Sequence, residues 1–224
     1  MAGTTSSDQQ QLLTVGQLLK VPQVRGLLTM QAIHGLSRDK WKLEAIYFVE
    51  VFGLTPVAAG SWLASIYMLG KVGQTLMGGV ETALIAAKVP TLTIRRNCSS
   101  LAWLLAAALE FAFMAARTPL QATACMALTG MANNLHSAGY HQALREVGGA
   151  DSGTLAGLWN TLPHLFSIVV PTICLLVRKR FGWRPLFWYG AGHQLLLLVL
   201  YRRVASVQTA RQMLEQNKPY RRGR

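Results

Sequence analysis

The sequence predicts an all-α membrane protein with about six transmembrane helices. Of its residues, 51% are hydrophobic and only 14% are charged, whereas charged residues make up about 25% of an ordinary soluble domain. The apolar residues gather in runs of roughly 20, the length of helix that crosses a bilayer. Strict alternation of polar and apolar residues is absent, which disfavours a transmembrane β-barrel.

Six apolar runs are the candidate spans. They cover residues 21–52, 56–87, 99–116, 120–144, 154–177 and 185–201. The first run is the weakest, because the charged residues between Arg38 and Glu44 interrupt it. The second run is long and rich in glycine, and the third is rich in alanine and leucine.

The last three runs differ in composition. The fourth is rich in small residues and carries Asn133, Asn134 and His136. Because small residues let helices approach and polar ones bond across them, we expect these three side chains to serve helix packing. The fifth run contains Pro163, and the sixth ends in an unbroken apolar stretch from Leu195 to Leu200.

Basic residues set the expected orientation and the domain boundaries. The chain carries a formal net charge of +13, and most of its Lys and Arg residues fall on the side of the amino terminus, which the charge rule places in the cytoplasm. The cluster from Arg178 to Arg180 falls on the other side. We expect a polar cytoplasmic lead-in over residues 1–20, a six-helix transmembrane domain over 21–201 and a basic cytoplasmic tail over 202–224. The lead-in has no apolar core, so a cleavable secretory signal is not expected.

Several classes of function are not expected. The positive charge lies between apolar runs and in the tail, and not on a soluble face beside aromatic residues, which argues against nucleic-acid binding. Cys98, Cys125 and Cys174 lie far apart, which predicts neither a zinc site nor a disulfide framework. The sequence contains no recognisable catalytic, phosphate-loop or metal-ligand motif, so we expect no enzyme activity, no metal and no cofactor.

Four segments, in chain order, carry the strongest functional signal. They read YFVEVFG at 47–53, GG at 78–79 with LI at 84–85 and TIRR at 93–96, GYH at 139–141 running on to Gly157, Asn160 and Thr161, and GWR at 182–184 with Phe187. In these segments the chain resembles the anion:cation symporters of the major facilitator superfamily. That family includes sodium/phosphate cotransporters, sialin, vesicular glutamate transporters and plastid phosphate transporters. The resemblance covers the last six of its twelve helices and implies half of a major-facilitator fold.

The chain departs from the family pattern at several motif positions. Ala83 stands where the family has an Asp, and Gly149 stands where it has a Pro. Ala143 and Leu144 stand in place of an Asn-His pair, although the acidic residue of the same stretch is kept as Glu146. The replacements at Ala83, Ala143 and Leu144 remove polar side chains from positions at which the family's motifs carry them.

The resemblance implies a multi-pass transporter of inorganic phosphate or organic anions, in a membrane that the sequence does not specify. The expected partners are the lipid bilayer, a small anionic substrate, and either a second six-helix half or a second copy of the chain, because substrates of this superfamily bind between two halves. The alternative is a truncated or diverged membrane protein that does not transport and has a packing or partner-binding role.

Ionisable side chains within the spans are the candidate site residues. Arg38, Lys71 and His164 are the expected substrate ligands, since an anion needs cationic or donor groups in an apolar wall. Alternatively, Arg38 belongs to an extramembrane turn, Lys71 extends along its stem to the membrane surface, and His164 packs between helices. Glu110 is the candidate for ion coupling, because a buried carboxyl can exchange protons; alternatively, it is simply protonated or paired.

The loop motifs add three further residues. Arg95 and Arg96 are expected to fix the orientation at the cytoplasmic face. Glu146 is the retained acidic position of the stretch after the fourth span.

Overall fold

The computed structural model describes residues 12–38 and 42–217, and every regular element in these residues is helical. The α-helices are, in chain order, α1 (Val15–Leu18), α2 (Pro22–Arg38), α3 (Glu44–Phe52), α4 (Pro56–Ala86), α5 (Thr91–Met114), α6 (Pro119–Asn133), α7 (Tyr140–Gly148), α8 (Ser152–Phe166), α9 (Val170–Phe181), α10 (Arg184–Val204) and α11 (Ala210–Gln216). Two 3₁₀ turns, η2 (Asn134–His136) and η3 (Gly149–Asp151), precede and follow α7. The predicted all-α class is therefore confirmed for this part of the chain.

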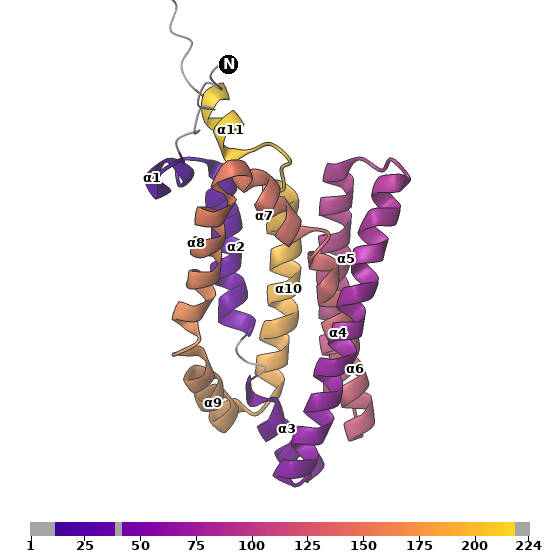
Figure 1. Cartoon of the computed structure of the whole chain (residues 1–224). Helices are drawn as coiled ribbons and strands as arrows, with labels where there is room; N and C mark the ends of the chain where they lie inside the picture. Colours follow the sequence, from indigo (N-terminus) through magenta and orange to yellow (C-terminus); the bar gives the residue numbers. More distant parts are fainter. Residues whose placement is uncertain (1–11, 39–41, 218–224) are drawn as a thin grey trace, which may run out of the picture.

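The long helices run up and down side by side (Figure 1). The turns after α3, α5 and α9 lie at one end of the molecule, which we call the lower end. The two short helices α1 and α11 and the turn between α4 and α5 lie at the other, the upper end. In the bundle, α10 packs between α5 and α2, α6 packs against both α4 and α5, and α8 packs on α2. Each pass through the bundle is thus antiparallel to the next.

Local sequence explains two of the turns at the lower end. α3 ends at Gly53, whose φ of 66° is a left-handed conformation that glycine adopts without strain. Thr55 then caps α4 with its side chain, and Pro56 occupies the first turn, where its missing N–H costs no hydrogen bond. Thr118 and Pro119 begin α6 in the same way.

Three of the predicted spans are interrupted in the structure. α2 ends at Arg38, and α3 begins at Glu44. The fourth span passes from α6 through η2 into α7. The fifth is divided between α8 and α9, with Pro171 in the first turn of α9, a position that tolerates proline. The other three spans correspond to the continuous helices α4, α5 and α10.

Large apolar side chains cover much of the outer surface. On α4, Val57 is 81% exposed and Met68 is 73% exposed, and Ile168 in the turn after α8 is 79% exposed. Soluble monomers keep such apolar patches small. By length and composition, two helical stretches of the described residues are apolar enough to cross a membrane: Thr91–Met114 and the succession of helices over Pro119–Phe181. These features support association with a membrane.

Parts of the segments expected as lead-in and tail pack onto the upper end. Leu18 of α1 is fully buried, and Met213 of α11 is 4% exposed; both belong to the main core cluster. The Leu13 N–H donates to one oxygen of Asp151 at 2.7 Å, and Arg211 pairs with the other oxygen at 3.4 Å. These contacts tie both flanking segments to the start of α8.

Candidate functional site

A pocket of about 470 Å³, lined by both polar and apolar side chains, lies between α2, α7 and α8. Its size falls in the range of small-molecule sites, roughly 300–1,000 Å³. Nine described residues line it: Gln31, His34, His141, Leu144, Arg145, Ser152, Ala156, Trp159 and Asn160. None of these residues is acidic.

Helical spacing brings the polar side chains to the pocket. On α2, Gln31 and His34 are three residues apart, and on α7, His141 and Arg145 are four apart. Residues three or four apart share one face of a helix, so each helix presents a polar face to the same hollow. Asn160 adds an amide from α8.

Arg145 supplies the positive charge of the pocket. Its side chain is exposed, and among the residues that the structure describes, no carboxylate lies within ion-pair distance of it. A guanidinium remains protonated and offers only donors. The Gln31 side chain is buried, and the Tyr140 hydroxyl shares its one proton between the Leu27 carbonyl at 3.2 Å and the Gln31 amide oxygen at 3.4 Å. The pocket therefore carries positive charge that suits an anion.

An apolar wall holds the α7 side chains in place. Trp159 of α8 is 6% exposed, and its ring centroid lies 4.3 Å from that of Tyr140. The His141 ring lies 6.1 Å from the same indole and nearly perpendicular to it. Such edge-to-face contacts are favourable for aromatic rings, so Trp159 fixes how His141 is presented.

A second charged cluster ties three helices together at the upper end. Arg95 of α5 is only 3% exposed. Its Nη1 lies 2.6 Å from Glu81 of α4, its Nη2 lies 2.7 Å from Glu146 of α7, and Nη1 also donates to the Ala138 carbonyl at 2.6 Å. Two of the loop-motif residues, Arg95 and Glu146, thus form one ion-pair network. Arg96 donates to a carbonyl just after α10 at 3.4 Å.

The predicted substrate ligands lie on different helices, and none of them lines the pocket. Lys71 is exposed on α4, which packs mainly against α6, and His164 is exposed on α8, which packs against α2 and α7. Arg38 is the last residue of α2, and its side chain lies outside the described part of the chain. Glu110, predicted to couple an ion, is fully buried on α5.

The fourth span contains polar residues that serve packing, as the sequence indicates. The Asn134 amide donates to the Gly70 carbonyl on α4 at 2.6 Å and to the Gly130 carbonyl at 3.0 Å. The buried His136 ring lies 4.7 Å from that of Trp103. The packing role is therefore confirmed for these two side chains.

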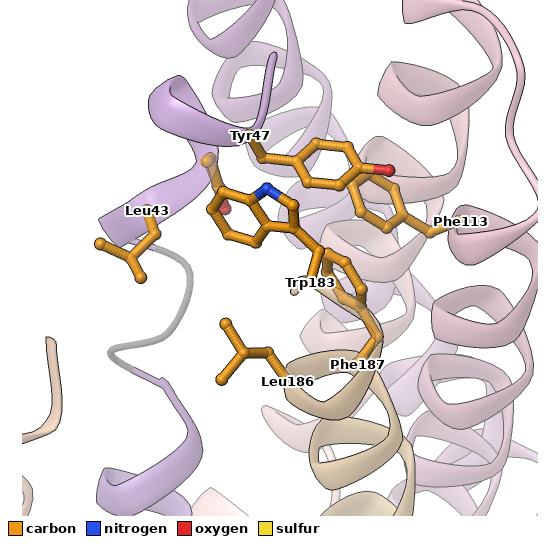
Figure 2. A pocket seen from close by; sticks show the side chains of 7 residues that line it. Leu43, Tyr47, Phe113, Trp183, Leu186 and Phe187 are labelled. Carbon is orange, nitrogen blue, oxygen red and sulfur yellow. The ribbon is translucent and has the colours of Figure 1, made fainter. Parts of the chain in front are cut away.

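Two of the motif segments meet at the lower end. Figure 2 shows Tyr47 of α3 beside Trp183 and Phe187, around a cavity of about 10 Å³. The Tyr47 ring centroid lies 5.1 Å from that of Trp183 and 5.3 Å from that of Phe187. The Trp183 indole donates to Glu50 at 3.2 Å, and Glu50 pairs with Arg178 at 2.5 Å. A cavity of this size holds about one water, so the cluster is a packing contact and not a ligand site.

Sequence reasoning did not assign His34, His141 or Arg145 to a site. His141 belongs to a motif only as part of the resemblance, and Arg145 contributes to the charge pattern. The four-residue spacing of His141 and Arg145 is the signal that indicates a shared face. Only the tertiary structure places that face opposite His34.

Among the described residues, no group of three or more His, Cys, Asp or Glu side chains is arranged to hold a metal ion. No model of a known protein family matches the chain, and no curated protein matches it in sequence. Its function is therefore inferred from its own residues and their geometry.

Proposed function

We propose that the chain is a multi-pass membrane protein that forms one half of a major-facilitator-type transporter of inorganic phosphate or organic anions. The observation that carries this proposal is the pocket between α2, α7 and α8, where Arg145 faces a hollow of about 470 Å³. The surrounding bundle exposes large apolar side chains. Arg145 is exposed at this hollow, so its guanidinium can donate charge-assisted hydrogen bonds to an anion that enters it.

The lengths of the continuous helices support the membrane part of the proposal. α4 has 31 residues, α5 has 24 and α10 has 21. At about 1.5 Å per residue, each reaches the roughly 30 Å thickness of the hydrocarbon core. The remaining passes are α2 with α3, α6 with α7 and α8 with α9.

The interrupted passes support the transport part. All three helices that line the pocket, α2, α7 and α8, belong to passes that are broken. In transporters, discontinuous helices typically form the substrate site.

A second half is needed for activity. Alternating access requires two walls around one site, and the proposed six passes form only one. The partner is either a second copy of the chain or a separate six-helix half. The chain alone, as a monomer, is therefore expected not to move substrate.

The experiment is uptake of radiolabelled inorganic phosphate and benzoate into liposomes. The purified chain is reconstituted either as a size-defined monomer or as a cross-linked dimer. Liposomes without protein serve as the control. We expect uptake above the empty-liposome level from the dimer and none from the monomer. Uptake by a proven monomer would refute the half-transporter proposal, and a folded dimer without uptake would refute transport by self-pairing.

A specific observation favours the second candidate, a membrane protein that does not transport. Ala143 is fully buried and Leu144 is 6% exposed, and both belong to the main core cluster. At these positions the family pattern has the Asn-His pair, so packing has replaced polar groups. A folded chain without uptake in any oligomeric state supports this candidate.

A further inference from the structure

We propose that the pocket between α2, α7 and α8 is an oxyanion site in which Arg145, His141 and His34 hold a phosphate group. The proposal deepens the function proposed above and rests on it for the membrane setting. It concerns equilibrium binding, however, so it can fail or succeed separately from transport. The phosphate belongs either to a free solute or to the headgroup of a membrane lipid.

The presence of donors on three helices favours a phosphate over a flat anion. Arg145 and His141 approach the hollow from α7, His34 approaches from α2, and Asn160 adds an amide from α8. A carboxylate accepts hydrogen bonds mainly in one plane, whereas a phosphate presents several oxygens in different directions. Donors from three helices can therefore be satisfied together by a tetrahedral phosphate.

The acidic residues near Arg145 along the chain are engaged elsewhere. Glu146, the next residue, is turned toward Arg95 at 2.7 Å. The Asp151 carboxylate is almost fully buried and is held by the Leu13 N–H and by Arg211. The positive charge of Arg145 is therefore left for a ligand. This arrangement differs from that of Arg95, whose charge is neutralised within the fold.

The position of the pocket explains why both sources of phosphate must be tested. Arg145 lies in the last turn of α7, and the cationic side chains of Arg96 and Arg202 also lie toward the upper end. Basic pockets between helices at a cytoplasmic membrane surface attract anionic lipid headgroups. A soluble phosphate reaches the same donors from water.

The test is binding to the purified full chain in dodecyl maltoside, a detergent without phosphate. One probe is inorganic phosphate, with chloride at equal ionic strength as its control. The other probe is dioctanoyl phosphatidic acid, with dioctanoylglycerol as the control that lacks phosphate. Binding is measured by calorimetry and by the rise in the midpoint of thermal unfolding, since a ligand that binds only the folded state stabilises it.

The decisive variant is Arg145→Gln, and Arg203→Gln is its matched control. Arg203 is also exposed and basic, and it lies near the same end but outside the pocket. Losing a charge-assisted bidentate contact should weaken phosphate binding about tenfold or more. Arg203→Gln should change the dissociation constant by no more than about twofold relative to the parent chain, because a remote surface charge is screened by salt. Arg145→Lys keeps the charge but loses the paired donors of the guanidinium. Its dissociation constant for phosphate should therefore lie between those of Arg145→Gln and Arg203→Gln. Circular dichroism establishes that each variant is folded.

Each outcome has a definite meaning. Binding of both probes that depends on Arg145 supports the site and shows that a free phosphate suffices, whereas binding of phosphatidic acid alone assigns the site to a lipid. Absence of binding to the parent chain, or equal binding by the parent and a folded Arg145→Gln variant, overturns the proposal. Transport in liposomes without this binding would refute the phosphate site but not the proposed function. Binding without transport would support the phosphate site but not the proposed function.

Discussion

At the scale of single residues, what distinguishes one arginine from another is whether the fold neutralises its charge. Arg95 is buried between two carboxylates and a carbonyl, so its guanidinium is committed to joining α4, α5 and α7. Arg145 lies exposed at the pocket, and among the described residues it has no carboxylate partner. Arg95 therefore stabilises the fold, whereas we propose that Arg145 binds a ligand.

Removing Arg95 should destabilise the chain. Arg95→Ala leaves Glu81 and Glu146 facing each other without their shared cation, and breaking a buried pair typically costs about 3–5 kcal/mol. Because the two carboxylates keep 23% and 21% exposure, we expect a loss near the lower limit. Denaturation in detergent measures the change in the free energy of unfolding. Arg203→Ala, with the same loss of charge, is expected to stay within about 0.5 kcal/mol; an equal loss in both variants would contradict a structural role for Arg95.

Gly139 permits a close approach of two helices. A Cβ at this position would meet the Ser99 side chain and would lie 2.9 Å from the Arg95 carbonyl oxygen. Gly139→Ala should therefore cost about 1–3 kcal/mol through overpacking. Gly157→Ala is the matched control, since a Cβ there meets no heavy atom within 4 Å and should stabilise α8 by about 0.5–1 kcal/mol. Thermal unfolding of the two variants should shift in opposite directions, and a shift of the same sign would argue against the close packing.

At the scale of the elements, the contrast lies between continuous and interrupted passes. α4, α5 and α10 run without a break, and α5 and α10 form much of the packed centre. The passes that contain α2, α7 and α8 are broken, and these three helices line the pocket. The pocket lies between these helices and not at the breaks themselves, since its lining residues belong to α2, α7 and α8.

The start of α6 offers a test of how local sequence sets a pass. The Thr118 side chain accepts a hydrogen bond from the Gln121 N–H, which satisfies a donor at the helix start. Thr118→Ala should cost about 1 kcal/mol of unfolding free energy. In the control variant Thr161→Ala, the hydroxyl removed bonds only to the preceding turn of its own helix, at Gly157. That loss should be within about 0.5 kcal/mol, and an equal effect of both substitutions would remove the capping explanation.

At the scale of the whole molecule, the two ends differ in the elements that they gather. The upper end holds α1, α11 and the turn between α4 and α5, and the lower end holds the turns after α3, α5 and α9 (Figure 1). Most of the basic residues that the charge rule assigns to the cytoplasm lie in segments at the upper end. The geometry is thus compatible with α1 and α11 on one side of a membrane.

Cysteine accessibility tests this topology. On a background in which Cys98, Cys125 and Cys174 are replaced, single cysteines are placed at positions 54, 118, 90 and 215. We expect a membrane-impermeant reagent to label positions 54 and 118 from the side opposite the cytoplasm and positions 90 and 215 only from the cytoplasmic side. Labelling of positions 54 and 90 from the same side would exclude six alternating passes.

The sequence by itself determined the helical class, because long apolar runs in which polar and apolar residues do not alternate disfavour β-strands. It also indicated where in the chain α4, α5 and α10 would lie, since a continuous apolar run is visible in the sequence without knowledge of which helices pack against it. Only the tertiary structure decided that Arg95 meets Glu81 and Glu146 and that His34 and Arg145 line one pocket. These residues are far apart in the chain, and local propensity carries no information about which helix faces will pack together.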